Sequence, residues 1–120
     1  MQIDERTSVR RVCFKGIWPT APRDFIVCTT WDKREDGSIL IVSRSAPDYY
    51  CAPQKGYVRG FIQVSGYWLQ PVQEGSEITT VVTLAAHTEL GGTLPASVIN
   101  MLSTSAPVKM LGTISEISRR

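Results

Sequence analysis

Apolar and polar residues alternate along most of the chain with a period of two, which is typical of half-buried β-strands. Glycine, proline and short polar residues separate these stretches and favour turns. The pattern predicts extended segments at residues 9–15, 25–31, 38–45, 57–64, 67–72 and 78–87. Most connections between them are short, so we expect consecutive strands to pair antiparallel in one sheet.

Several connections have recognisable turn chemistry. Asp36-Gly37 predicts a tight hairpin turn in which both central residues tolerate positive φ. Ser65-Gly66 is expected to bend the chain between two strands, and residues 73–76 to form a polar turn. Residues 47–56 form a longer loop with two prolines and two tyrosines.

The period of the apolar positions changes near the end of the chain. Pro95 suits the first turn of a helix, where its missing N–H costs nothing. An apolar stripe with helical spacing follows, comprising Val98, Ile99, Leu102, Ala106, Met110, Leu111, Ile114 and Ile117. Pro107 is expected to kink the helix or break it in two, because it leaves the carbonyl of Ser103 without its helical partner.

A sheet followed by one amphipathic helix predicts an α+β fold, in which the helix buries its apolar stripe on the sheet. A curved sheet packed against a long helix leaves room for an apolar hollow between them. Such a hollow suits a lipid-like ligand.

Composition narrows the classes of protein to consider. The chain has 120 residues, enough for one domain, with 42% hydrophobic and 20% charged residues. No apolar run approaches the length of a membrane span, and residues 1–11 lack the apolar core of a signal peptide. The net charge of +2 argues against nucleic acid as a partner. Arg6, Arg10, Arg11 and Lys15 cluster either as a solvated strand end or as a weak attraction to anionic lipid.

The reactive residue types form no recognisable site. Cys13, Cys28 and Cys51 lack the short spacing of a zinc site, and the first two are expected to be buried in apolar strands. Three unpaired cysteines predict a reducing, cytoplasmic compartment. Only Arg23, Asp24 and His87 are candidates for acid-base chemistry, and they form no constellation. We therefore predict no enzyme activity, no metal site and no cofactor, and a structural role for His87.

Six motifs in fixed order carry a family resemblance. They are Trp18-Pro19, Arg23-Asp24-Phe25, Asp36-Gly37, residues 53–60 (Pro-Gln-Lys-Gly-Tyr-Val-Arg-Gly), residues 94–100 (Leu-Pro-Ala-Ser-Val-Ile-Asn) and residues 102–107 (Leu-Ser-Thr-Ser-Ala-Pro). Their order and spacing resemble the StAR-related lipid-transfer (START) domain family over residues 9–120.

The resemblance implies a helix-grip fold, a curved antiparallel β-sheet closed by a long C-terminal α-helix. It implies a tunnel for one lipid, such as a sterol, a phospholipid or a ceramide, and transfer or sensing of that lipid at transient membrane contacts without bond chemistry. The N-terminal part of such a domain has no counterpart here. The chain is then a fragment, with other domains of a larger protein to complete it, or a second subunit supplies the missing surface. A fragment that acts as an interaction or regulatory module without an enclosed lipid is the alternative function.

The resemblance also assigns residues. Arg23 and Asp24 match an Arg-Asp pair at the start of a strand, where they point to opposite faces and have a structural role. Arg59 is a candidate partner of Asp24 or of a nearby carboxylate. Two loops match the tunnel mouth and membrane contact: Trp18 and Pro19 in one, and Gly91, Gly92, Thr93 and Leu94 in the other. For these loops, a packed Trp18 and ordinary turn glycines are the alternatives.

The alternation within this family pattern places a set of residues on the wall of the hollow. They are Phe25, Val27, Thr29, Trp31, Ile39, Ile41, Ser43, Ile62, Val64, Val82, Leu84 and Ala86 from the sheet, with Val98, Ile99, Leu102 and Met110 from the helix. For each of them an ordinary core position is the alternative. Some relatives carry charged, amide or phenolic groups where this chain has Thr29, Ser43 and Leu84. A lipid with one modest polar group therefore suits this wall better than a charged headgroup.

Overall fold

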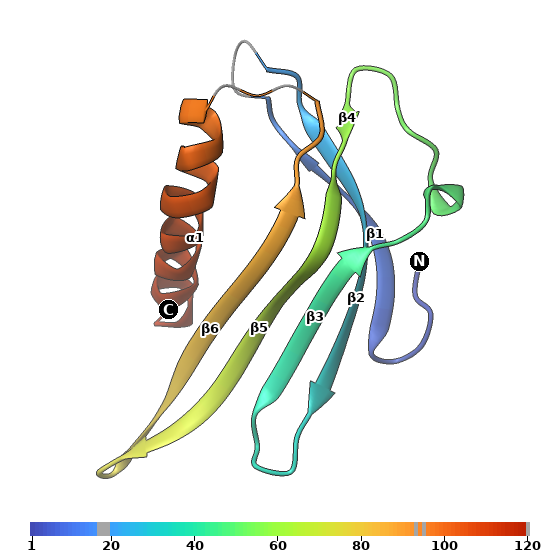
Figure 1. Cartoon of the computed structure of the whole chain (residues 1–120). Coiled ribbons are helices and arrows are strands. Elements are labelled where there is room, and N and C mark those ends of the chain that lie inside the picture. Colours follow the sequence, from blue (N-terminus) through green and yellow to red (C-terminus); the bar gives the residue numbers. More distant parts are fainter. Residues whose placement is uncertain (17–19, 93, 95, 120) are drawn as a thin grey trace.

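The computed structural model describes residues 1–16, 20–92, 94 and 96–119. The strands and helices are, in chain order, β1 (Thr7–Phe14), β2 (Arg23–Lys33), β3 (Ile39–Ser45), the 3₁₀ turn η1 (Asp48–Tyr50), β4 (Val58–Arg59), β5 (Phe61–Glu74), β6 (Glu77–Glu89) and α1 (Ala96–Ser118). The strands form one sheet in the order β1-β2-β3-β5-β6, in which all these neighbours pair antiparallel (Figure 1). The predicted α+β arrangement of an antiparallel sheet and one C-terminal helix is confirmed.

The two-residue strand β4 is the exception to this order. It pairs parallel with the first two residues of β2, Arg23 with Val58 and Asp24 with Arg59. Strand β3 begins to pair with β2 only at Val27, so β4 occupies the edge of β2 that β3 leaves free. This short pairing sets Arg59 beside Asp24.

The hairpin turns differ in detail from the expectation. The connection between β2 and β3 has five residues, 34–38, and Gly37 has a φ of +85° whereas Asp36 does not have a positive φ. Arg34 donates its N–H to the Ser38 carbonyl and accepts from the N–H of Gly37, the pattern of a type I turn followed by a glycine. The predicted requirement for positive φ at both central residues is therefore wrong.

The bend predicted at Ser65-Gly66 is also wrong, since β5 continues through it. A Cβ built on Gly66 would lie 3.0 Å from the carbonyl oxygen of Ile41, so the glycine permits the close approach of β3. The irregularity lies earlier, where the register with β6 shifts between Ile62 and Val64, and Ser45 Oγ accepts the N–H of Ile62 at 2.8 Å. This is a β-bulge.

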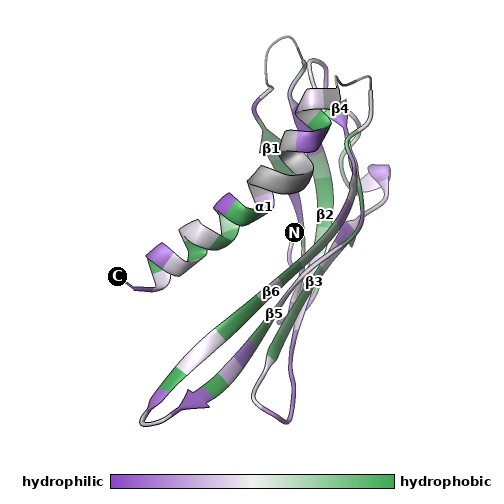
Figure 2. Cartoon of the chain, turned by 60° about the vertical axis from the view of Figure 1, so that its left-hand side comes forward, coloured by the Kyte–Doolittle hydropathy of each residue, from purple (hydrophilic) through white to green (hydrophobic). Residues whose placement is uncertain are grey.

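Helix α1 lies beside β6, the last strand at one edge of the sheet (Figures 1 and 2). We call the face of the sheet that α1 approaches the helix-facing side, and the opposite face the far side. Tyr67 identifies the helix-facing side, because its hydroxyl lies 2.8 Å from the sulfur of Met110 in α1. Pro107 lies inside α1, which continues unbroken, so the helix is not divided in two.

The expected burial of the helix stripe on the sheet is only partial among the described side chains: Leu111 and Ile114 are half-buried, whereas three others are exposed. The side chains of Val98, Leu102 and Ala106 lie outside the described part. Ile99 and Met110 are each 44% exposed, and Ile117 is 55% exposed. Figure 2 shows the C-terminal half of α1 diverging from the strands. The physical reason is that this half of α1 leads away from the strands, so its apolar side chains have no sheet surface to cover.

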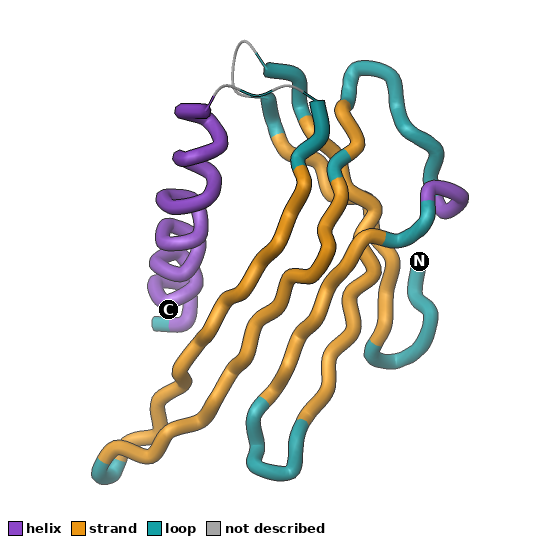
Figure 3. The backbone as a smooth tube through the Cα atoms, viewed as in Figure 1, coloured by secondary structure: helices purple, strands orange, loops and turns teal. Residues whose placement is uncertain are grey.

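The densest packing lies at the start of β2. Phe25, Ile26 and Val27 are at most 8% exposed, and Val9 of the neighbouring strand is 6% exposed. By contrast, the β5–β6 hairpin extends past the other strands (Figure 3), because β3 pairs with β5 only between residues 65 and 69. Ile78 near its tip is consequently 72% exposed. The sheet is therefore well packed at the end nearest the start of α1, and it exposes apolar side chains to solvent at the other end.

Candidate functional site

The strand register assigns the predicted wall residues to faces of the sheet. The helix-facing side carries Phe25, Val27, Thr29 and Trp31 of β2, Ile39, Ile41 and Ser43 of β3, Ile62 of β5, and Val82, Leu84 and Ala86 of β6. Phe25 and Val27 are buried, Trp31 and Ala86 are exposed, and the others are half-buried. From α1, Ile99 and Met110 have described side chains, whereas the side chains of Val98 and Leu102 lie outside the described part.

Val64 is the exception among the sheet residues. It pairs with His87. His87 follows Ala86, which lies on the helix-facing side, so His87 and Val64 lie on the far side. The bulge after Ile62 adds one residue, and one added residue moves each following side chain to the opposite face. Simple alternation from Ile62 missed this bulge. It also missed Tyr67 and Leu69, which lie on the helix-facing side opposite Leu84 and Val82.

A transverse row of hydroxyl groups crosses the helix-facing side. Direct pairing aligns Ser8 with Thr29, Thr29 with Ser43, Ser43 with Ser65, and Ser65 with Ala86. We call the first four residues the hydroxyl row. All four are half-buried, and the hydroxyls of Thr29 and Ser43 are 2.7 Å apart. The sequence predicted only Thr29 and Ser43 of this row, because Ser8 and Ser65 join them only through the register of four strands.

Apolar and aromatic residues flank the hydroxyl row on the side nearer the turn between β2 and β3. The next aligned row contains Trp31, Ile41, Tyr67 and Leu84, and the one after it contains Ile39, Leu69 and Val82. A cavity of about 350 Å³ lies against the β1 end of the hydroxyl row, with Ser8, Thr29 and Trp31 in its lining. It is open to solvent on one side, and Gln2, Glu5, Arg6 and Arg10 make the rest of its lining polar or charged.

The basic cluster of the N-terminal segment is divided between the two faces. Arg10 pairs with Val27 on the helix-facing side and contributes to the cavity. Arg6 lies 4.8 Å above the ring of Trp31 and bonds Asp32 at 2.8 Å. Arg11 points to the far side, where it contacts Asp24. The cluster is thus not one solvated patch.

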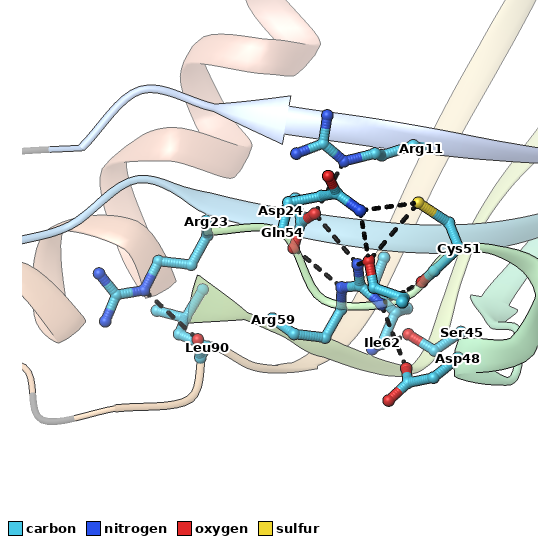
Figure 4. A network of polar contacts seen from close by, with 11 residues as sticks. Arg11, Arg23, Asp24, Ser45, Asp48, Cys51, Gln54, Arg59, Ile62 and Leu90 are labelled. Atoms are coloured by element: carbon cyan, nitrogen blue, oxygen red, sulfur yellow. Dashed lines mark hydrogen bonds and ion pairs between the residues drawn. The ribbon is translucent and has the colours of Figure 1, made fainter. Parts of the chain in front are cut away.

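The far side carries a buried ionic cluster around Asp24 (Figure 4). Asp24 has no exposed surface, and its carboxylate accepts the Nε–H of Arg59 and the Nε–H of Arg11, each at 2.8 Å. The Arg59 guanidinium, followed by that of Arg11, holds the pKa of Asp24 below its ordinary value, against the opposing effect of burial. The expected pairing of Arg59 with Asp24, and the opposite orientation of Arg23 and Asp24, are confirmed.

Arg59 also fastens the loop that follows β3. Its Nη1 donates to the carboxylate of Asp48 at 3.2 Å and to the carbonyl of Cys51 at 3.0 Å. Its Nη2 donates to the carbonyl of Ala52 at 3.3 Å. One guanidinium therefore joins β4, β2 and the loop at residues 47–56.

The predicted mouth loops meet at Arg23. Its guanidinium, on a residue only 8% exposed, donates to the carbonyls of Ala21, Leu90 and Gly91. Gly91 and Gly92 have φ values of +72° and +63°, and both are exposed, while Leu94 is half-buried. Trp18, Pro19 and Thr93 lie outside the described residues.

The reactive residues remain dispersed. Cys13 is exposed, contrary to expectation, because it lies near the end of β1, the edge strand of the sheet, while Cys28 and Cys51 are half-buried. His87 is exposed on the far side. Among the described residues, no group of three histidine, cysteine or acidic side chains is placed to hold a metal ion. None of the described helices is long and apolar enough to cross a membrane.

Comparison with known proteins places these features in a family. A family model described as "START domain" matches residues 2–119. StAR-related lipid transfer protein 5 of Mus musculus is 35% identical over 95 residues, which cover 79% of this chain and 43% of that protein. An uncharacterized protein of Pseudomonas aeruginosa is 32% identical over 94 residues, which cover 78% of this chain and 45% of that protein.

Solved structures give the same result. Human StAR-related lipid transfer protein 5 superposes with a TM-score of 0.68 at 30% identity, covering 82% of this chain and 47% of that one. Human STARD10 has a similar fold, with a TM-score of 0.75 at 24% identity, covering 89% of this chain and 42% of that one. The chain thus spans less than half the length of these relatives.

Proposed function

Because the chain belongs to the START domain family, we propose that it binds one lipid between α1 and the helix-facing side of the sheet. A single observation carries this proposal. The hydroxyl row lies directly beside two apolar rows on the helix-facing side, so one surface offers both a polar and an apolar zone. An amphiphile with a small polar group matches that division.

The ligand class follows from the same surface. The hydroxyls of Thr29 and Ser43 already bond each other, so they offer weak neutral contacts to a ligand. A sterol or a ceramide suits such contacts, and a phospholipid would need Arg10 nearby. We propose that the chain binds without changing bonds in the lipid, and that it transfers or senses the lipid at the cytoplasmic surface of membranes. We propose membrane contact through the loops at residues 16–22 and 91–94.

The alternative function is an interaction or regulatory module that encloses no lipid. Exposure of α1 favours it, since Val108 is 71% exposed and Ile117 55% exposed. A helix that leaves its apolar residues in water is suited to contact another protein surface. The two functions differ in whether the helix-facing side is occupied by a lipid.

The test uses two neighbouring alanines on β6. Ala86 lies on the helix-facing side and Ala85 on the far side, and both are exposed. Purified protein is incubated with mixed cell lipids and re-isolated. The bound lipid is then extracted, identified and quantified by mass spectrometry. We expect about one lipid per chain for the wild type and for Ala85→Trp, and a loss of roughly tenfold in occupancy for Ala86→Trp, because the indole fills the lipid's place. Equal occupancy in both variants, or no lipid in the wild type, would favour the interaction module.

A further inference from the structure

We infer that Arg23 is a positioning residue that couples the two mouth loops and thereby sets the rate of lipid exchange. The inference rests on the proposed lipid binding, and it assigns a role to a residue for which the sequence predicted only a structural one. We call the contacts of the Arg23 guanidinium with the carbonyls of Ala21, Leu90 and Gly91 the Arg23 clasp.

The Arg23 clasp joins segments that are distant in sequence. Arg23 is the first residue of β2, and Ala21 belongs to the connection from β1 to β2. Leu90 and Gly91 belong to the connection from β6 to α1, and their carbonyls accept from Nε at 3.4 Å and from Nη2 at 3.1 Å. Figure 4 shows Arg23 reaching Leu90, away from the cluster around Asp24.

The chemistry of the acceptors makes the two loops depend on each other. Within the described part of the chain, Arg23 bonds main-chain carbonyls and no carboxylate, since Asp24 points to the far side and serves Arg11 and Arg59. A nearly buried cation held only by neutral oxygens needs each of them, because every lost bond leaves charge unsolvated. When one loop moves away from Arg23, the contact of the guanidinium with the other loop is therefore weakened.

The glycines of the second loop complete the arrangement. A Cβ on Gly91 would lie 3.0 Å from the carbonyl oxygen of Arg59, and a Cβ on Gly92 would lie 3.2 Å from Nη2 of Arg23. Both residues have positive φ, so a side chain at either position would also be strained. The loop at residues 90–92 is thus seated on β4 and on Arg23 itself. The two glycines allow this close approach.

The clasp determines where α1 starts. The helix begins at Ala96, four residues after Gly92, and four residues of extended chain reach at most about 14 Å. A lipid bound beneath α1 must pass the helix or the loops beside its start in order to enter or leave. Weakening the clasp should therefore raise the population in which α1 has moved away from the sheet, and with it the rate of lipid exchange.

The experiment compares Arg23→Gln and Arg23→Lys with the wild type in the full chain. The probe is a fluorescent cholesterol analogue that moves between phosphatidylcholine vesicles. We expect transfer to be roughly tenfold faster for Arg23→Gln, the effect of losing about one charged hydrogen bond, with equilibrium occupancy changed less than about twofold. Arg23→Lys keeps the charge but loses the planar fork, so it should give an intermediate rate.

Two further measurements make the result specific. Ile26→Val removes one buried methylene on the far side, which lowers stability without touching either loop, and its transfer rate should equal that of the wild type. Hydrogen exchange requires no lipid: in Arg23→Gln the amides of peptides covering Ala21 and Gly91 should lose protection together.

The outcomes distinguish a failure of the loop coupling from a failure of the proposed lipid binding. An unchanged transfer rate in Arg23→Gln, an equal acceleration in Ile26→Val, or loss of protection in one loop alone would overturn the coupling. A wild-type protein that takes up no probe lipid would overturn the proposed lipid binding instead, and the hydrogen-exchange result would then decide the coupling by itself.

Discussion

Replacement of Asp24 by asparagine tests how much the ionic cluster on the far side contributes to folding. Asp24 has no exposed surface, and its carboxylate compensates the guanidiniums of Arg59 and Arg11, which are 14% and 32% exposed at the side chain. Asparagine preserves the shape but leaves Arg11 without its anion and leaves Arg59 with only the exposed carboxylate of Asp48. Breaking a buried ion pair from one side costs about 3–5 kcal/mol. Because Arg11, which covers the site, is partly exposed, we expect the free energy of unfolding to fall by about 3 kcal/mol. This is a large share of the stability of a small domain.

The assay is urea unfolding followed by circular dichroism, with Asp32→Asn as the matched control. Asp32 also pairs with an arginine at 2.8 Å, but it is 62% exposed and Arg6 is 49% exposed, so water replaces the lost contact. We expect a clear fall in the unfolding midpoint for Asp24→Asn and no resolvable change for Asp32→Asn. Equal losses in the two variants would show that burial around Asp24 does not strengthen its ion pairs.

The same variant has a predictable dependence on pH. The folded-state pKa of Asp24 lies below its unfolded value of about 3.9, so its contribution is complete above that pH and is lost as the pH falls through the folded-state pKa. Between pH 6 and pH 3 the wild type should therefore lose more stability than Asp24→Asn does. Asp36, whose pKa is also lowered by its bonds to Ser38, should leave a residual acid dependence in both proteins. An identical slope in the two proteins would contradict the lowered pKa.

Two further predictions concern packing and the sheet edge. Gly60→Ala should destabilise the protein by about 1–3 kcal/mol, because its Cβ would lie 2.3 Å from the buried ring of Phe25, whereas Gly112→Ala in α1 meets no atom within 4 Å and should be neutral or stabilising in thermal unfolding. A reversed order of these two variants would show that the Phe25 ring can move aside. In the described part of the chain no strand pairs with the outer edge of β6, which is uncharged between Ile78 and Ala86, so the protein should self-associate. Thr83→Lys should reduce the associated fraction in light scattering, and a wild type that is monomeric at high concentration would refute this.

The local pattern of the sequence was sufficient for the elements themselves. Period-two alternation located β2 and β6 to within about two residues at either end, because a strand's pattern of burial is set by its own side chains. The helical stripe and Pro95 located α1 in the same way. The motifs around Arg23-Asp24-Phe25 and residues 53–60 pointed to the family, which the comparisons confirmed. The expectation that Arg59 partners Asp24 also came from these motifs.

The tertiary structure decided what depends on how strands align. The bulge after Ile62 moved Val64 to the far side and brought Tyr67 to the helix-facing side, and no local pattern marks an extra residue in a strand. The hydroxyl row joins residues on four strands, and the Arg23 clasp joins Ala21 to Gly91, 70 positions apart. Such groupings exist only once the register is set, because hydrogen bonds between strands fix which residues lie side by side, whereas the sequence fixes only which residues alternate.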